Sequence, residues 1–512
     1  MLTLTQYPGK IYRFLGMFLP KNISILICLA FLFTFKGLYS QHLQALHGSD
    51  HAGSQGVLNN PASSLRSRLP WDLTIFSLQA DVLTNVLSTD KPNLPQNSGS
   101  FLFNKGNFGR NLNTMINLNL LTATVKASSK LSLSVGSNIR SYTKLSSSIF
   151  NYFDSLQTPD TFFYANVLNQ PLGIKILSSS WVEVYGSAAY QLLDRDKFTI
   201  NVGGTLKLNR GLSGLYLDAS DIKFMELPQG FNSKYAITSV DMDFGYSYTM
   251  EKWKSSQSPI QNIKNLVKFA ESGYSLDLGV EIIIKDRKDV SLYDDTPVNE
   301  YKWKLGLSLL DLGFVKFQHG DLSLKSRGIK TNASGFSLEE KFDQTVSSLK
   351  ILTDSLKTVV NVFTQPAENF NVNLPLRLQF NVDRKFTKYF YVNVATVIDV
   401  ASTFYPKKFH LSEYDIYSIT PRLENGHLGI YVPFSIHGSG EKRVGAALKL
   451  GSILLGVDRA AIFSRKNNSQ NARIYFSLRL NPLSIFKKKQ GVKPDKDAFR
   501  TLDSRSKESE QR

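Results

Sequence analysis

Strict alternation of apolar and polar residues constrains the fold of this chain more than any other feature. Between residues 198 and 209, apart from Gly203 and Gly204, apolar side chains occupy even positions, whereas Thr, Asn and Lys occupy odd positions. The same pattern recurs at residues 131–140, 274–282, 374–383 and 474–480. Successive side chains of a β-strand point to opposite faces of the sheet. The pattern therefore predicts strands with one apolar face and one polar face.

Alternation alone leaves two folds open, because a soluble sandwich turns its apolar face inward and a membrane barrel turns it outward. Connection lengths distinguish them, since membrane barrels alternate short periplasmic turns with longer extracellular loops. Short turns are expected at residues 128–130, 194–197, 384–388, 424–427 and 451–452. Long connections are expected at residues 145–180, 250–272, 316–371, 401–410 and 459–471. The two kinds alternate along the chain, which favours a closed barrel.

The barrel is expected to contain about 16 strands, although about 14 would also satisfy the pattern. The strands are expected at residues 71–80, 112–127, 130–144, 181–193, 198–208, 213–225, 234–249, 273–285, 301–315, 372–383, 389–399, 411–423, 428–437, 443–450, 453–463 and 472–480. The predicted fold is all-β, a transmembrane antiparallel β-barrel of about 14 to 16 strands. A small N-terminal hatch and a helical insertion in one long loop are expected to accompany it.

Residues 1–40 have the order of a secretory signal peptide. Three basic residues precede an apolar run at residues 23–35, and cleavage is expected near Ser40. The alternative is a membrane-spanning helix, but such a helix needs about 20 apolar residues and this run is shorter. Cys28, the single cysteine, lies inside the run, so the mature chain is expected to hold no thiol.

The remainder divides into three expected parts. Residues 41–70 form an N-terminal hatch or plug segment, and residues 71–481 form the barrel. Residues 482–512 are rich in Lys, Arg, Asp, Glu and Ser with little to bury, so they are expected to be a disordered charged periplasmic tail.

One long connection is expected to contain a helix. Ser337 and Glu340 have the spacing of a capping box, and apolar residues recur at near-helical intervals from residue 342 to residue 363. Such a helix could act as a lid or plug over the lumen. The interpretation we favour is a helix that packs on the barrel rim.

Charge and motifs exclude several classes of function. The formal net charge is +18, and four basic residues in the expected signal peptide account for +4, which leaves +14. That excess is spread along the chain, whereas nucleic-acid binding needs a concentrated basic stripe, so no nucleic acid is expected as a partner. The serine-hydrolase elbow, the phosphate-binding loop, the zinc-protease motif and the dinucleotide glycine fingerprint are absent from the sequence. We therefore assign no catalytic residue and no cofactor, and expect no enzyme.

The one cluster of histidines lies near the expected mature N-terminus. His42, His47 and His51 accompany Asp50, and His47 and His51 could share a helical face as metal ligands. Glycines surround these residues, however, and a glycine-containing loop is poorly suited to hold a metal geometry. No metal site is assigned.

Residues 53–62, which end in Asn59-Asn60-Pro61-Ala62, resemble the N-terminal signature of FadL-type long-chain fatty acid transporters and of the related PorV-like proteins of Bacteroidota. Residues 274–279, 309–313 and 448–458 look like strands of an uncharacterised Bacteroidota outer-membrane family. The resemblance implies that Asn60, Pro61 and Ala62 belong to a hatch or ligand region. Independently, Pro61 fixes its own backbone and holds Asn60 extended, which gives either a stiff bend into the first strand or a plain turn.

Two functions follow as hypotheses. The first is passive transport of a hydrophobic or small amphiphilic solute across the cell outer membrane, with the membrane lipid and a hydrophobic small molecule as partners. The alternative is a PorV-like docking or secretion-associated surface protein without transport activity, whose partner would be a secreted protein. A hydrolase embedded in the barrel is a third, weaker hypothesis.

Overall fold

The computed structural model describes residues 46–67, 69–89, 101–153, 158–229, 233–254, 256–286, 301–329, 349–360, 364, 366–406, 409–459 and 472–482. The expected signal peptide, and the expected tail beyond residue 482, lie outside these described residues. Among the described helices none has the length and apolar character needed to cross a membrane.

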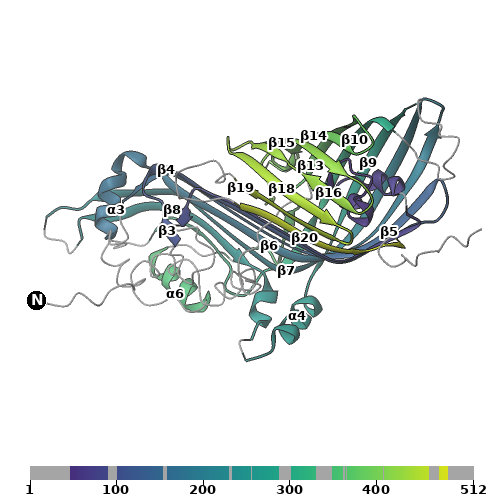
Figure 1. Cartoon of the computed structure of the whole chain (residues 1–512). Coiled ribbons are helices and arrows are strands. Elements are labelled where there is room, and N and C mark those ends of the chain that lie inside the picture. Colours follow the sequence, from purple (N-terminus) through teal and green to yellow (C-terminus); the bar gives the residue numbers. More distant parts are fainter. Residues whose placement is uncertain are drawn as a thin grey trace, which may run out of the picture.

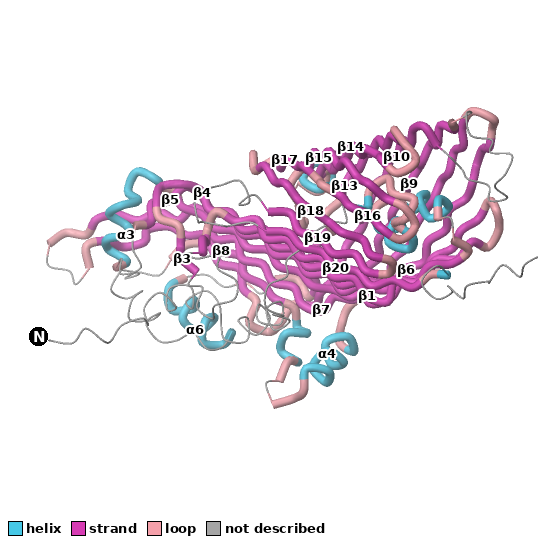
Figure 2. The backbone as a smooth tube through the Cα atoms, in the orientation of Figure 1, coloured by secondary structure: helices cyan, strands magenta, loops and turns pink. Residues whose placement is uncertain are grey.

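Fourteen antiparallel strands form one closed ring (Figures 1 and 2). In order they are β1 (Trp71–Thr84), β4 (Gly106–Lys126), β5 (Leu131–Tyr152), β6 (Leu172–Asp194), β7 (Phe198–Glu226), β9 (Ser272–Lys285), β10 (Tyr301–Gln318), β13 (Arg377–Lys385), β14 (Phe390–Asp399), β15 (Ile416–Glu424), β16 (Leu428–Tyr431) with β17 (Phe434–His437), β18 (Lys442–Leu450), β19 (Ile453–Arg459) and β20 (Ala472–Leu480). Strand β1 closes the ring because it pairs with β4 on one side and with β20 on the other.

Short elements decorate the ring. The additional strands are β2 (Leu87–Thr89), β3 (Phe101–Phe103), β8 (Tyr235–Tyr246), β11 (Leu324–Arg327) and β12 (Asn369–Asn373). The helices are η2 (Gly53–Leu58), η3 (Pro61–Arg66), α3 (Pro159–Asn166), η4 (Val167–Asn169), η5 (Tyr248–Lys252), α4 (Pro259–Lys268), α6 (Leu349–Val359) and α7 (Ala401–Phe404).

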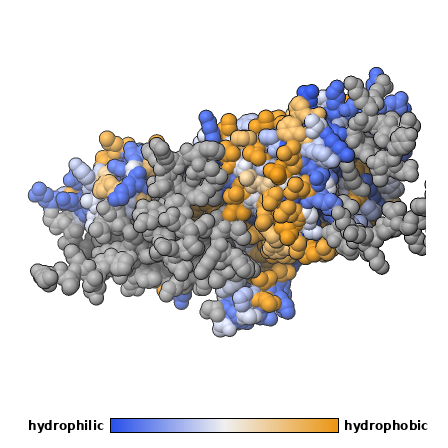
Figure 3. All heavy atoms as spheres, viewed as in Figure 1, coloured by the Kyte–Doolittle hydropathy of each residue, from blue (hydrophilic) through white to orange (hydrophobic). Residues whose placement is uncertain are grey.

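The ring is apolar outside and polar inside, which is the transmembrane arrangement. Val135 and Leu206 are 57% and 71% exposed on the outer surface, whereas their neighbours Ser134 and Lys207 are buried on the inner surface. Figure 3 shows the apolar residues gathered in a band across the visible face of the barrel. The structure therefore confirms the closed barrel, and the alternative of a soluble sandwich with an apolar interior is wrong.

The ring has fourteen strands and not the sixteen expected, because two of the expected strands form one continuous strand and another lies outside the ring. Residues 198–208 and 213–225 belong to the single strand β7, since β6 pairs with both parts and only shifts register beside Gly211. Strand β8 lies outside the ring, because it pairs with the second half of β7 on one side and with β11 on the other. The glycine-containing stretch between the two expected strands is a bulge in a continuous strand and not a turn.

On the side of the long connections, β4 to β7 continue beyond the ring and form, with β8 and β11, what we call the projecting sheet (Figures 1 and 2). Helix α6 covers this sheet, because its Leu356, and Val360 just after it, join an apolar cluster with Met242 of β8 and Leu324 of β11. The expected helix is thus present at 349–359 and packs on the sheet instead of filling the lumen. Its expected capping box lies outside the described residues.

Candidate functional site

Residues 46–67, here called the N-terminal segment, lie inside the barrel at the end of the short turns. Ser54 donates from its backbone N and its Oγ to Asp72 of β1, at 2.8 and 2.6 Å. Gln55 Nε2 donates to Ser477 Oγ of β20 at 2.5 Å. The side chains of Ser54 and Gln55 are both almost completely buried. Most of the predicted hatch region therefore fills part of the lumen and is held there by side chains of the inner wall.

The predicted site residues Asn60, Pro61 and Ala62 lie together against this wall. Asn60 has an extended backbone and caps η3: its Oδ1 accepts a hydrogen bond from Ala62 N at 3.0 Å, and Pro61 occupies the first helical position. Its Nδ2 donates to Val280 O of β9 at 3.1 Å. Pro61 suits this position because its missing N–H has no partner at a helix start. A role of the three residues in ligand binding stays a prediction.

Three glycines of neighbouring strands form the seat for this turn. A Cβ atom at Gly203 of β7 would lie 2.5 Å from Ala62 N, and one at Gly279 of β9 would collide with Asn60 Oδ1. Gly203 and Gly279 are direct partners in the sheet, and Gly306 of β10 also faces Asn60. Glycine inside a strand marks a close approach of backbone or ligand, so these positions could have been identified from sequence as a contact surface.

Ion pairs connect the N-terminal segment to the opposite wall. Lys304 Nζ of β10 donates to Asp50 Oδ1 at 2.5 Å and to Gly48 O at 2.6 Å. Arg66 Nε lies 2.9 Å from Glu281 Oε1 of β9. Asp50, the carboxylate of the histidine cluster, is therefore an ion-pair partner of a lysine. Among the described residues no group of three or more His, Cys, Asp or Glu side chains is arranged to hold a metal ion.

Further along the lumen, Asp311 of β10 is completely buried and binds cations from three other strands. Arg140 donates to both of its oxygens at 2.7 and 2.9 Å, Lys207 Nζ donates at 2.8 Å, and Arg377 donates at 2.6 Å. Asp277 accepts the backbone N–H of Asp311 at 2.7 Å. A buried charge is tolerated only when it is paired and hydrogen-bonded, and we call this group the Asp311 cluster.

Asp311 also marks a change in the direction of β10. Its φ is +64°, Gly313 has a φ of +158°, and the register with β9 shifts between Leu309 and Leu312. Beyond the bulge β10 pairs with β12, with Phe317 opposite Phe370. Residues 314–318 and β12 form a two-stranded ribbon that we call the cap. The expected strand at 372–383 is thus divided, because its start belongs to the cap and its remainder to β13.

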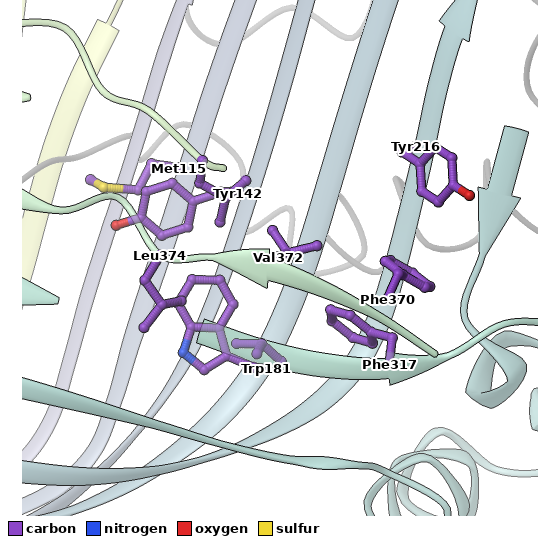
Figure 4. Packing of buried hydrophobic residues seen from close by; sticks show 10 residues of the cluster. Met115, Tyr142, Trp181, Tyr216, Phe317, Phe370, Val372 and Leu374 are labelled. Atoms are coloured by element: carbon purple, nitrogen blue, oxygen red, sulfur yellow. The ribbon is translucent and has the colours of Figure 1, made fainter. Parts of the chain in front are cut away.

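The cap lies over an apolar patch on the inner wall, shown in Figure 4. The patch consists of one residue from each of four adjacent strands: Met115, Tyr142, Trp181 and Tyr216. The rings of Tyr142 and Trp181 stack at 5.5 Å, and those of Tyr216 and Phe370 meet edge to face at 5.3 Å. The cap covers the patch on the long-connection side of the Asp311 cluster.

Sequence reasoning missed the patch, although a signal was present. Tyr142 has the strand parity of Arg140, and Trp181 has the parity of Glu183, and both charged residues point inward. An aromatic residue in the inward register of a polar lumen is an exception to the alternation. The arrangement offers an enclosed apolar surface beside ionic groups, which suits a nonpolar molecule with a small polar end.

The family model described as "Family of unknown function (DUF5723)" matches residues 61–458. No curated protein matches the chain. Among solved structures, a deletion mutant of the monoaromatic hydrocarbon channel TodX shares 10% identity at a TM-score of 0.40, covering 83% of this chain and 94% of that one. A FadL homologue of Pseudomonas aeruginosa shares 8% identity at a TM-score of 0.39, covering 86% and 98%. The Pseudomonas putida toluene transporter TodX shares 9% at 0.34, covering 86% and 95%.

Proposed function

We propose that this chain, which belongs to the DUF5723 family, is a passive outer-membrane transporter for hydrophobic or small amphiphilic solutes. The membrane assignment is supported by the exterior of the ring, where apolar residues such as Leu206 and Val135 face outward and charged residues face the lumen. Closed antiparallel barrels with this distribution satisfy their backbone inside hydrocarbon and belong to outer membranes.

The observation that carries the proposal is the apolar patch on the inner wall, beside the charged residues of the Asp311 cluster. A nonpolar solute gains about 25 cal/mol for each Å² of apolar surface that leaves water, and the patch offers such burial on the long-connection side of the lumen. In the described state the cap occupies this surface with Phe317 and Phe370. A solute would therefore replace the cap side chains on the wall.

The N-terminal segment is the second barrier on this route. Hydrogen bonds and ion pairs hold it, among them Ser54 to Asp72 and Lys304 to Asp50. These bonds join the segment to the wall and not the wall strands to one another, so the strand pairing of the ring does not depend on them. We propose that passage requires displacement of the segment, with the solute gradient as the source of free energy.

Uptake of a labelled long-chain fatty acid and of a labelled aromatic hydrocarbon tests the proposal in a strain that lacks the gene. A cysteine pair Ser54→Cys with Thr74→Cys would lock the N-terminal segment to β1, because the two hydroxyl oxygens lie 2.7 Å apart. The matched pair Thr124→Cys with Ser134→Cys has its oxygens 2.8 Å apart but joins two wall strands. We expect the oxidised lock to abolish uptake, a reductant to restore it, and the control pair to transport normally.

Unchanged uptake in the deletion strain would overturn the transport proposal. The alternative, docking of a secreted or surface protein without transport, predicts that such a strain keeps its uptake and loses surface-protein export. A strain in which neither the lock nor its reduction changes uptake would also contradict the transport proposal. The two functions therefore make opposite predictions for the same strain.

A further inference from the structure

Helix α4 lies outside the barrel wall. It lies at the border of the apolar band on the outer surface of the ring, which we call the belt. The outward face of β7 carries Leu206 and Leu208, which are 71% and 42% exposed, while the intervening Lys207 and the following Asn209 are buried in the lumen. Arg210 is the next outward residue, and its Nη2 donates to Val267 O of α4 at 3.1 Å. Arg210 lies two residues beyond Leu208, about 7 Å along the strand at about 3.3 Å per residue. The C-terminal end of α4 therefore adjoins the end of the belt.

The figures agree with this position. In Figure 1, α4 projects from the outer side of the wall near β7. In Figure 3, the apolar surface of the barrel extends to the part of the molecule that contains the helix. On the neighbouring strand β9, Tyr274 is 63% exposed and pairs with Leu208. An aromatic residue at this level suits the girdle at a membrane surface.

The helix is amphipathic, but its apolar surface is wider than its packing needs. Asn262 and Leu266 form its buried side, and Ala270, just beyond the helix, is also buried. Ile260, Ile263 and Val267 follow one another at helical spacing and form a second apolar stripe beside it. Ile260 is 69% exposed and Ile263 is 37% exposed. Within the described part of the chain, no other element buries the side chains of Ile260 and Ile263 on this ten-residue helix.

Lysines flank this apolar stripe. Lys264 and Lys268 lie one turn apart and are exposed, and Lys268 Nζ lies 5.5 Å from the ring centre of Phe269. Lys252 of η5 lies 3.9 Å from the ring centre of Tyr248 and 5.5 Å from that of Phe269. Lysines and aromatic rings beside an apolar stripe are typical of helices that lie in a membrane interface.

We propose that α4 is a membrane-surface anchor of this barrel. Ile260, Ile263 and Val267 enter the apolar zone beneath the lipid headgroups, and Lys264 and Lys268 bind headgroup phosphates. The inference rests on the proposed insertion of the barrel in a membrane, because the lipid surface that α4 meets is the continuation of the lipid around Leu208. That continuity, together with the flanking positive charge, favours lipid over a protein as the occupant of the stripe.

Depth-dependent quenching tests the anchor. The chain, with Cys28 replaced by serine, carries one cysteine-linked environment-sensitive fluorophore at Ile263→Cys, at Gln261→Cys on the exposed polar side of α4, or at Leu206→Cys in the belt. Each protein is inserted into vesicles whose acyl chains carry bromine. We expect quenching at residue 263 to exceed that at residue 261 by about twofold or more, and quenching at residue 206 to be the strongest.

Lipid charge tests the lysines. Quenching at residue 263 is compared in phosphatidylcholine alone and in phosphatidylcholine with phosphatidylglycerol. We expect the anionic lipid to increase it, and the variant Lys264→Gln with Lys268→Gln to remove that increase. A label at residue 263 that lipid does not quench, while residue 206 is quenched, overturns the anchor and leaves the barrel proposal intact. Self-quenching between labelled chains would also overturn it, since a second copy would then cover the stripe.

If residue 206 is not quenched either, the barrel is not inserted and the proposed function fails with the anchor. The two failures are therefore distinguishable in one set of samples.

Discussion

The two halves of β7 belong to one strand but distribute their side chains in opposite ways. In residues 198–209 the apolar side chains are outside, with Leu206 exposed, and the one charged residue, Lys207, is buried in the lumen. In residues 215–226 Ala219 and Phe224 are buried, and Asp221 and Lys223 form an exposed ion pair. The first distribution suits lipid and the second suits water, and we therefore infer that the membrane border lies near Gly211, where the distribution inverts.

The comparison is sharpest at two aspartates. Asp311 and Asp221 are the two described residues other than glycine with a positive φ, at +64° and +51°. Both occupy places where the strand pairing shifts register. Asp311 is buried with three cations, whereas Asp221 is exposed beside Lys223. The same local backbone geometry therefore places one carboxylate among three buried cations in the lumen and the other in a single ion pair exposed to water.

The first prediction is that Asp311→Asn destabilises the chain by about 3–5 kcal/mol, because it leaves Arg140, Lys207 and Arg377 without their shared anion. Asparagine tolerates a positive φ, so the variant removes charge and keeps the backbone. Unfolding in urea, followed by the mobility of unheated samples on gels, measures the loss. Asp221→Asn is the matched control, and we expect no measurable change. Equal effects of the two variants would contradict the comparison.

The second prediction concerns charge on the outer surface. Leu206→Arg places a cation on the lipid side of β7 and is expected to cost about 2–4 kcal/mol if the position is near the bilayer centre. Met225→Arg makes the same change at an exposed apolar residue in the other half of the strand. There the new cation meets water and should have little effect. Unfolding in lipid vesicles measures both, and a harmless Leu206→Arg would place this half of β7 outside the membrane.

The third prediction separates the two faces of the same half. Gly203→Val adds a side chain against the backbone of Ala62, and Gly204→Val adds one that would find its nearest neighbour at 3.8 Å. Overpacking of this kind costs about 1–3 kcal/mol, and displacement of the N-terminal segment is the cheaper response. We expect Gly203→Val to raise protease cleavage of residues 46–67 and ion conductance in planar bilayers. Gly204→Val should resemble the parent chain. A Gly203→Val variant with the cleavage and conductance of the parent chain would argue against the glycine seat.

These contrasts also show how far sequence alone could lead. Alternation predicted the ring, its apolar exterior and most strand positions, because the pattern is local and repeats every two residues. The continuity of β7 escaped it, since the glycines at 211 and 214 resemble a turn until β6 is seen to pair across them. Pairing partners are distant in sequence, and local composition does not contain them.

The candidate site was predictable in part. For Asn60, Pro61 and Ala62 the sequence left open a stiff bend into the first strand or a plain turn. The structure places them on the inner wall at the start of η3, which precedes β1. The Asp311 cluster was not recognisable, because Arg140, Lys207, Asp311 and Arg377 come from four strands that only the closed ring brings together. Its members look like ordinary lumen residues until their distances are known.

The smallest expected effect concerns the attachment of the cap beyond the membrane border. His319 follows β10 directly: its Nε2 lies 3.0 Å from Tyr216 Oη of the apolar patch, and its Nδ1 lies 2.5 Å from Ala367 O just before β12. One imidazole therefore connects the wall to both strands of the cap. Burial lowers the pKa of His319 below its ordinary value of 6.5, although the hydrogen bond to Ala367 O opposes this shift.

A histidine whose pKa is lowered in the folded state favours the neutral form there, so its contribution is complete above the unfolded pKa and is lost as the pH falls through the folded one. We expect backbone hydrogen exchange in residues 314–318 and 366–373 to increase as the pH is lowered from about 7.5 to about 5, after correction for the intrinsic pH dependence of exchange. His319→Gln should remove that increase, and residues 198–210 should show none. If the corrected exchange of the cap in the parent chain does not change with pH, packing of Phe317 and Phe370 alone holds the cap. His319 then does not attach the cap to the wall in a pH-dependent way.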